Sequence, residues 1–188
     1  MWKVKKSPIH GYGVVATEEI NKGTKIIEYK GEKITKKEGD RRSELRIKRY
    51  SKKSDKGIVY IFELNKKYDI DGTPHYNKAR YINHSCEPNC EVEIEKGKIW
   101  ISSIKKIKKG DELSYDYGYD FDKDDYKDHV CKCGKKKCIG YVISSDEWDN
   151  FKKFKKKFKK KKKLNIKNIL DKEKFWIIIS FTQPVRQN

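Results

Sequence analysis

The spacing of four cysteines constrains the fold of this chain more than any other feature. Cys131, Cys133 and Cys138 lie in one short segment, whereas Cys86 lies 45 residues before Cys131. Three thiolates in so short a loop do not readily complete a tetrahedral metal site, and Cys86 supplies a fourth. The spacing therefore predicts a zinc ion that joins two segments far apart in the chain.

Two neighbouring residues leave the set of zinc ligands open. Cys90 lies four residues after Cys86, and His129 lies two residues before Cys131. Either side chain is a zinc ligand in other proteins. We favour Cys86, because free cysteine is a common buried residue and Cys90 begins a segment with the pattern of a strand. Four thiolates leave no open position for water, so the predicted zinc is structural.

Composition limits the size of the core and indicates the compartment. The chain has 188 residues, of which 40% are charged and 35% are apolar. We expect one compact domain with an appendage. Five cysteines, three of them beside lysines, favour metal-bound thiolates in a reducing compartment over disulfides. The apolar run Phe175 to Phe181 is too short to span a bilayer, so we expect a soluble protein. From the cysteines we expect it to be intracellular, and we favour a monomer.

Positive charge is concentrated near the end of the sequence. Ten of the twelve residues from Lys152 to Lys163 are lysines, about half of the formal net charge of +19. Four aromatic residues recur there at helical spacing and predict a basic helix that begins near Ser144: Trp148, Phe151, Phe154 and Phe158. Two interpretations are equally good. The helix docks its aromatic stripe on the domain and exposes its lysines, or it binds nucleic acid or an anionic membrane surface.

The first 143 residues show short strand patterns and little helix. Apolar alternation and turn residues predict strands around Val4, at residues 13–16, 24–29 and 58–64, and in a hairpin of residues 90–94 with 99–101. One helix is expected from Thr35 to Tyr50, where Thr35 and Glu38 fit a capping box. Strands and helices do not alternate as in a parallel sheet. We therefore predict a mainly β fold of several small sheets with few helices.

Four motifs occur in a recognisable order. They are Gly11-Tyr12-Gly13-Val14, the segment Asn77 to Cys90, the segment Gly110 to Tyr117, and Cys131-x-Cys133-Gly134-x3-Cys138. Together, over about Trp2 to Val142, they resemble a SET-domain protein lysine methyltransferase with a post-SET zinc-binding loop. The resemblance implies a SET-type β fold with a threaded C-terminal segment. It divides the chain into a SET domain (1–127), a post-SET zinc loop (128–143) and a basic helical extension (144–188).

The resemblance also implies an enzymatic activity. The family transfers a methyl group from S-adenosyl-L-methionine to a lysine amine by in-line displacement, with cofactor and lysine entering from opposite faces. Six positions match the cofactor segments: Gly11, Tyr12, Gly13, Arg80, Asn83 and His84. Arg80 is expected to brace the local fold, and a turn histidine is the alternative for His84. The four family zinc ligands match Cys86, Cys131, Cys133 and Cys138.

Three tyrosines match the family's catalytic positions. In the family, the tyrosine that matches Tyr117 points its hydroxyl at the transferring methyl group and the incoming nitrogen, whereas Tyr115 and Tyr60 match positions that line the lysine channel. Tyr115 occupies the position that influences the number of methyl groups added, and its hydroxyl predicts mainly monomethyllysine, with dimethyllysine second. An ordinary half-buried strand tyrosine is the alternative for each. The implied substrate is a lysine-containing basic protein such as a histone, in the nucleus or on the chromosome of a eukaryote, or in the cytoplasm of a bacterium.

The segment from Asp116 to Asp128, around and directly after Tyr117, contains only two lysines but six aspartates. We hypothesise that they steer basic protein tails toward the lysine channel, while the lysine-rich segment anchors the enzyme to nucleic acid that carries such substrates. A solvated acidic loop is the alternative.

Two other classes of protein remain open. One is a catalytically inactive SET-fold zinc module that binds chromatin. The presence of Tyr117, Asn83, His84 and the glycine turn together argues against this class, because an inactive module has no chemical need for the set. The other is a nucleic-acid binder that acts chiefly through Lys152 to Lys163, for which salt-sensitive binding without cofactor uptake is expected.

Overall fold

The structure is a computed structural model that describes residues 1–50 and 59–160. It contains two compact units, Met1–Ser145 and Asp146–Asn188, and each is described by itself. The domain boundaries at residues 127 and 143 stay predictions.

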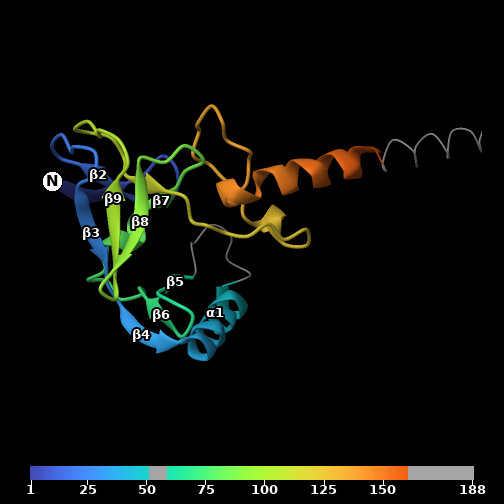
Figure 1. Cartoon of the computed structure of the whole chain (residues 1–188), viewed down its shortest axis with the longest axis horizontal. Coiled ribbons are helices and arrows are strands. Elements are labelled where there is room, and N and C mark those ends of the chain that lie inside the picture. The colour runs from blue at the N-terminus through green and yellow to red at the C-terminus, as the bar shows by residue number, and fades with distance from the viewer. Residues whose placement is uncertain (51–58, 161–188) are drawn as a thin grey trace, which may run out of the picture. The chain divides into compact units, whose positions relative to one another are not determined.

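The first unit is built from small sheets rather than from one large sheet (Figure 1). Two antiparallel strands form the first sheet, β1 (Trp2–Lys6) and β2 (Tyr12–Ala16). A second sheet has the order β3 (Lys25–Tyr29), β9 (Lys98–Ser103) and β8 (Cys90–Glu95). A third has the order β4 (Glu32–Thr35), β6 (Tyr68–Asp71) and β5 (Ile61–Glu63). The predicted mainly β fold of several small sheets is thereby confirmed. Ile58 of the predicted strand 58–64 lies outside the described residues.

The β8–β9 hairpin forms where the sequence predicts it. Lys96 and Gly97 connect the strands with φ values of 49° and 74°, as a two-residue turn of the I′ type requires. The register pairs Val92 with Ile101 and Ile94 with Ile99. Ile99 and Ile101 are fully buried and contribute to the main core.

The sequence analysis did not predict strands β4 and β6, although Tyr68 and Ile70 alternate with Asp69 and Asp71 in β6. Asp69 and Asp71 of β6 are buried, with only 5% and 3% of their surface exposed. Cationic side chains of the helix at residues 36–50, which precedes β6 in the chain, compensate for this burial: Lys36 contacts Asp69 at 2.7 Å, and Arg46 contacts Asp71 at 2.8 Å. Buried carboxylates are stable when they are paired in this way.

Helix α1 (Lys36–Tyr50) begins at the predicted capping position. The backbone N–H of Glu38 donates a hydrogen bond to Oγ1 of Thr35 at 3.3 Å, which is one half of the expected capping box. The helix is anchored to β6 largely by charge, because Arg42 Nη1 also lies 2.8 Å from Asp71. Leu45 is 53% exposed.

Two very short parallel strands bring the central motifs together. Strand β7 (Asn83–His84) pairs with β10 (Ser114–Tyr115), so Asn83 lies opposite Ser114 and His84 opposite Tyr115. The Ser85 backbone N–H donates to the Tyr115 carbonyl at 3.1 Å and extends this contact. The segment that carries the predicted catalytic tyrosines therefore runs beside the segment that carries the predicted cofactor residues.

The second unit is described as far as residue 160. Residues 148–160 are helical and follow a 3-10 turn, η3 (Ser145–Glu147). Phe154 and Phe158 stack with ring centroids 6.1 Å apart, and Phe158 is 59% exposed. Lys161 to Lys163 and residues 164–188 lie outside the described part. Among the described residues, no helix is both long enough and apolar enough to cross a membrane.

Candidate functional site

The four cysteines of the predicted zinc site lie together. Their sulfur atoms are all within 4.8 Å of one another. Cys86 Sγ lies 3.8 Å from Cys131 Sγ and 3.7 Å from Cys138 Sγ. These separations are far above the bond length of a disulfide. The structure thus brings Cys86 to the three downstream cysteines, as their spacing predicted.

The sulfur geometry fits a zinc ion. Zinc–sulfur bonds of about 2.3 Å at tetrahedral angles place the sulfurs about 3.8 Å apart, which agrees with the two distances from Cys86. Burial raises the pKa of the Cys86 thiol to about 12. A thiol of this kind loses its proton to a metal rather than to water at neutral pH. Cys86, Cys131, Cys133 and Cys138 are therefore compatible with a structural zinc site.

The two alternative ligands lie elsewhere. Cys90 is 1% exposed at the start of β8 and belongs to the main hydrophobic core. His129 directs Nε2 toward Asp125 at 3.7 Å, and its ring contacts Tyr119 at 5.6 Å between centroids. Neither belongs to the cysteine cluster found among the described residues.

The loop that carries the three downstream cysteines is also fastened by ordinary hydrogen bonds. Val130 forms an antiparallel bridge with Tyr141, and the Cys131 N–H donates to the Gly140 carbonyl at 3.0 Å. The Lys137 N–H donates to Oε2 of Glu87 at 3.1 Å, next to Cys86. The zinc loop is thus held against the segment that supplies the fourth sulfur.

Tyr117 lies two residues beyond the end of β10, and its hydroxyl has a defined direction. The Oη–H donates a hydrogen bond to the Ile82 carbonyl at 2.9 Å, immediately before β7. Burial raises the pKa of Tyr117, and the phenols of Tyr119 and Tyr60 add to this shift, so the hydroxyl stays neutral at physiological pH. Because its proton is used by Ile82, the oxygen keeps lone pairs to accept a further hydrogen bond.

Tyr117 belongs to a row of aromatic rings that leads from the interior to the surface. Successive centroids lie 5.2, 6.2, 5.0 and 5.8 Å apart along Tyr29, Phe62, Tyr115, Tyr117 and Tyr119. Tyr29 is 5% exposed, whereas Tyr119 is 40% exposed. Burial raises the pKa of Tyr115, which is therefore also neutral. Such a row is an apolar wall with hydroxyl groups at intervals, suited to a long side chain with a polar end.

Tyr60 and Arg80 form a separate contact. The Arg80 guanidinium lies over the Tyr60 ring at 4.3 Å and over the Tyr81 ring at 5.1 Å. Nη1 of Arg80 donates to the Thr73 carbonyl. These contacts support the expectation that Arg80 braces the local fold. Nε of Arg80 is nevertheless buried and is the one buried side-chain nitrogen or oxygen of the described residues that lacks a hydrogen-bond partner.

Asn83 connects the glycine turn to a carboxylate that the sequence analysis did not single out. Nδ2 of Asn83 lies 2.8 Å from Oε1 of Glu112 and 3.1 Å from the Tyr12 carbonyl. Ser7 Oγ donates to the same Glu112 carboxylate at 2.9 Å. Glu112 therefore holds the turn of residues 7–12 against β7. The only signal in the sequence was its place in the Gly110 to Tyr117 motif.

Gly11 and Gly13 differ in what requires a glycine at each position. Gly11 has a φ of 47°, and a Cβ there would meet nothing within 4 Å, so the turn faces open space. At Gly13 a Cβ would overlap the Glu112 carboxylate. The sequence analysis matched both glycines to the cofactor segments, and in the structure the missing side chain of Gly13 leaves space for Glu112. Tyr12, between them, is 54% exposed.

His84 is buried where the tyrosine segment and the cysteine cluster meet. The Tyr117 N–H lies 3.2 Å from its Nδ1, and Cys86 Sγ lies 3.6 Å from its Nε2. Burial lowers the pKa of His84 more than the nearby carboxylate of Asp116 raises it. The ring also contacts Tyr117 edge to face at 5.4 Å between centroids.

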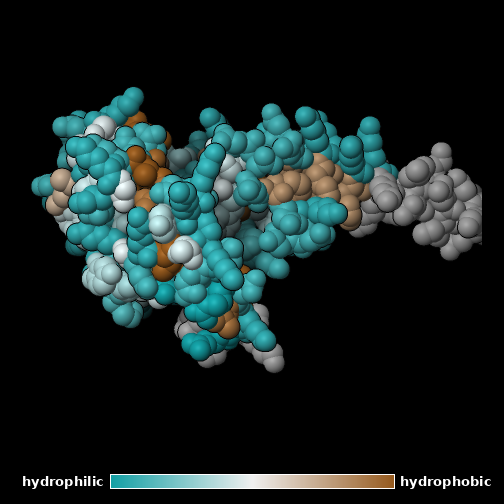
Figure 2. Space-filling view, turned by 60° about the horizontal axis from the view of Figure 1, so that its bottom comes forward, coloured by the Kyte–Doolittle hydropathy of each residue, from teal (hydrophilic) through white to brown (hydrophobic). Residues whose placement is uncertain are grey.

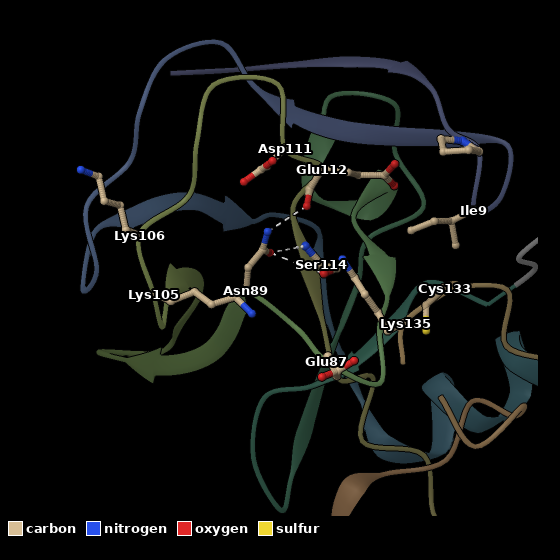
Figure 3. A pocket seen from close by; sticks show the side chains of 11 residues that line it. Ile9, Glu87, Asn89, Lys105, Lys106, Asp111, Glu112, Ser114, Cys133 and Lys135 are labelled. Atoms are coloured by element: carbon tan, nitrogen blue, oxygen red, sulfur yellow. Dashed lines mark hydrogen bonds between the residues drawn. The ribbon is translucent and has the colours of Figure 1, made fainter. Parts of the chain in front are cut away.

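A polar hollow of about 330 Å³ lies beside these groups (Figure 3). Glu112, Asn89, Ser114 and Cys133 are among its lining residues, and three lysines, Lys105, Lys106 and Lys135, surround it. Asn89 fixes its floor by donating to the Glu112 carbonyl at 2.9 Å and accepting from the Ser114 N–H at 2.8 Å. Neither Tyr117 nor any other residue of the aromatic row lines this hollow.

Comparison with known proteins agrees with this geometry. The family model of the SET domain matches residues 11–118, which is more than half of the chain. The chain belongs to the SET domain family.

Several curated relatives share this region. The chain is 39% identical over 137 residues to human histone-lysine N-methyltransferase 2D, and 42% identical over 137 residues to the histone-lysine N-methyltransferase trr of Drosophila melanogaster. It is 37% identical over 141 residues to the H3 lysine-4 specific histone-lysine N-methyltransferase of Saccharomyces cerevisiae. The matches cover 71%, 71% and 73% of this chain but only 2%, 5% and 13% of those proteins.

Proposed function

We propose that this chain is an S-adenosyl-L-methionine-dependent protein lysine N-methyltransferase that acts on a basic protein such as a histone. The observation that carries the proposal is the position of Tyr117. Its neutral hydroxyl is oriented by the Ile82 carbonyl at 2.9 Å, inside an aromatic row and beside the His84 segment. The relatives described above are histone-lysine N-methyltransferases, which supports the proposal.

The residues around the glycine turn fit the cofactor. The turn at Gly11 is open, Tyr12 is exposed, and Arg80 Nε is a buried donor without a partner among the described residues. A buried donor of this kind calls for an acceptor that a bound molecule can supply. When bound, S-adenosyl-L-methionine supplies a methyl group on a sulfonium, already a good leaving group. The chain therefore needs to align the reactants more than to activate them.

The aromatic row fits the lysine. At pH 7 a free lysine amine with a pKa near ~10.4 loses its proton at a cost of about 4–5 kcal/mol. Burial between Tyr115, Tyr117 and their neighbours lowers that pKa and so reduces the cost. The Tyr117 oxygen then accepts a hydrogen bond from the amine and fixes the direction of its lone pair. Tyr60, whose ring is covered by Arg80, is assigned to the wall of the channel.

We assign the four cysteines to a structural Zn²⁺ ion that holds the post-SET loop beside the tyrosine segment. Four thiolates leave no position for a reacting water, so the metal acts on the fold. The supporting observation is the sulfur separation of 3.7 and 3.8 Å from Cys86.

Cofactor uptake separates the proposal from its rivals. The zinc-loaded protein is titrated with S-adenosyl-L-methionine by calorimetry and then incubated with labelled cofactor, histones and a cell extract. The proposal predicts saturable uptake and labelled lysine in a basic protein. Uptake without any labelled protein would favour the inactive zinc module, and absence of uptake would exclude the enzyme.

A second activity is favoured by the basic helix. Seven lysines lie within residues 152–160, and six of them are exposed. We propose that this segment binds nucleic acid and so localises the enzyme to chromatin. Changing Lys152, Lys153, Lys156 and Lys157 to glutamine should weaken binding to duplex DNA and reduce its salt dependence by about 0.9 per lost phosphate contact. Changing Lys105, Lys106, Lys108 and Lys109 removes equal charge elsewhere, and an equal effect from this control would contradict the proposal.

A further inference from the structure

His84 is placed between two parts of the site that the chain keeps far apart in sequence. On one side its Nδ1 lies 3.2 Å from the backbone nitrogen of Tyr117. On the other side its Nε2 lies 3.6 Å from Sγ of Cys86. The ring is 5% exposed, so water does not compete freely for either nitrogen.

The hydrogen-bond partners determine which nitrogen carries the proton. A backbone amide is only a donor, so Nδ1 must accept from the Tyr117 N–H and cannot be protonated. In a neutral imidazole the other nitrogen then carries the hydrogen. Nε2–H therefore points its proton at the Cys86 sulfur.

Asp116 does not disturb this assignment. Its Oδ1 is 3.7 Å from Nδ1 of His84, which is too long for a hydrogen bond. The carboxylate is instead used by backbone donors, the Gly118 N–H at 3.1 Å and the Ser145 N–H at 2.8 Å. His84 thus has one accepting and one donating nitrogen, each with its own partner.

We propose that His84 is a positioning residue that transmits the state of the cysteine cluster to Tyr117. A donor to a metal-bound thiolate stabilises the anionic sulfur and fixes the orientation of the ring. The fixed ring then holds the main chain of Tyr117, whose hydroxyl is directed at Ile82. Loading the four cysteines with metal therefore orders the tyrosine segment, and the consequence for methyl transfer rests on the function proposed above.

Two substitutions separate the two bonds. The side-chain amide of asparagine reaches the position of Nδ1, and that of glutamine reaches the position of Nε2. His84→Asn keeps an acceptor for the Tyr117 N–H and loses the donor to Cys86. His84→Gln keeps the donor to Cys86 and loses the acceptor. His129→Asn is the matched control, because this imidazole faces Asp125 and Tyr119 rather than a sulfur.

The experiment measures metal absorption and affinity and the hydrogen exchange of one backbone amide, rather than enzymatic activity. With cobalt(II) in place of zinc, His84→Asn should shift the thiolate-to-cobalt absorption to lower energy and weaken metal affinity by roughly 10- to 100-fold. His84→Gln and His129→Asn should leave the band unchanged. Hydrogen exchange at the Tyr117 amide should accelerate in His84→Gln and in the unsubstituted protein after metal removal, but not in His84→Asn with metal bound.

A measurement without substitution guards against a variant that fails to fold. In the unsubstituted protein loaded with cadmium-113, spin coupling should connect the metal to the Nε2 proton of His84 across the sulfur. Absence of this coupling, an unshifted cobalt band in His84→Asn, or no metal uptake at all would each overturn the proposal. Normal metal spectra in a protein without methyl transfer would instead contradict the proposed function alone.

Discussion

The Tyr117 hydroxyl donates to the Ile82 carbonyl at 2.9 Å, so the side chain of one motif is directed by the main chain of another. The two residues are 35 positions apart in the sequence, and the short parallel pair of β7 with β10 brings them together. This contact sets the direction of the oxygen to which we assign the alignment of the lysine amine.

Removing the Tyr117 hydroxyl should abolish alignment of the lysine amine without preventing binding of the cofactor. We expect Tyr117→Phe to lower kcat by about 100-fold or more, the loss typical of one positioned polar group at a reaction centre. Cofactor affinity, measured by calorimetry, should change little. Tyr76→Phe serves as a control, since Tyr76 is 64% exposed and lies outside the aromatic row. A fully active Tyr117→Phe protein would refute the assigned role.

The hydroxyl of Tyr115 should limit the number of methyl groups that are added to the lysine. Tyr115 is 6% exposed and packs between Phe62 and Tyr117, so a methylated nitrogen has little room to rotate into line. Mass spectrometry of a saturated reaction should show mainly monomethyllysine, whereas Tyr115→Phe should shift the product toward di- and trimethyllysine. Tyr68→Phe should leave the distribution unchanged. Trimethyllysine as the main product of the unsubstituted protein would contradict this prediction.

Removing zinc should loosen one segment rather than unfold the domain. A chelator should increase hydrogen exchange in residues 128–143 and reduce methyl transfer, while β3, β9 and β8 stay protected by their own core. Cys86→Ser should lose bound zinc, as counted by native mass spectrometry. Cys90→Ala should retain it and lose only core stability. Retention of zinc by Cys86→Ser would show that the ligand set is wrong.

The pairing of Asp71 should make stability depend on pH. Burial alone would raise the pKa of this carboxyl, but hydrogen bonds from Arg46, Thr73 and Arg42 lower it below its usual value. A lowered pKa contributes stability above the unfolded value of about 3.9, and this contribution is lost as pH falls toward the folded value.

The corresponding variant removes this contribution. Asp71→Asn should lower the free energy of unfolding by roughly 3 kcal/mol at pH 7, and the difference should shrink below about pH 4. Denaturant titrations at several pH values measure it. Asp40→Asn, which changes an exposed residue of helix α1, should change stability by at most about 0.5 kcal/mol. An equal loss at pH 3 and pH 7 would contradict the pairing.

The acidic segment after Tyr117 should affect the binding of basic peptides. Asp120, Asp122, Asp124 and Asp125 are exposed, and Figure 2 shows a hydrophilic surface over most of the visible face. Replacing these four residues with asparagine should raise KM for a basic peptide and reduce its dependence on salt, because long-range attraction is lost. Unchanged KM at low salt would show that the loop is merely solvated.

The parts of the fold with a local pattern could be predicted from the sequence. Val92 and Ile94 alternate with acidic residues and precede a Lys96-Gly97 turn, so the hairpin could be predicted. The association of Cys86 with its three partners was also predicted, because a tetrahedral metal site needs a fourth ligand. Strands β4 and β6 were missed, because each has only four residues and the alternation of Tyr68 and Ile70 with two aspartates gives no sign that the aspartates are buried.

The missed part of the site has a similar cause. Glu112 is an ordinary acidic residue by sequence, and its partners Ser7 and Asn83 lie 105 and 29 positions away. His84 was predicted from its motif, but its contact with the Cys86 sulfur depends on the orientation of a buried ring. Contacts between side chains from distant segments follow from the fold and have no local pattern of their own.

The most direct test is an experimental structure of the zinc-loaded protein with the demethylated cofactor product and a peptide that contains lysine. The account predicts the Tyr117 oxygen within about 3 Å of the lysine nitrogen, with the peptide in the aromatic row and the cofactor at the Gly11 turn. A lysine nitrogen bound away from Tyr117, or a cofactor bound away from that turn, would contradict it.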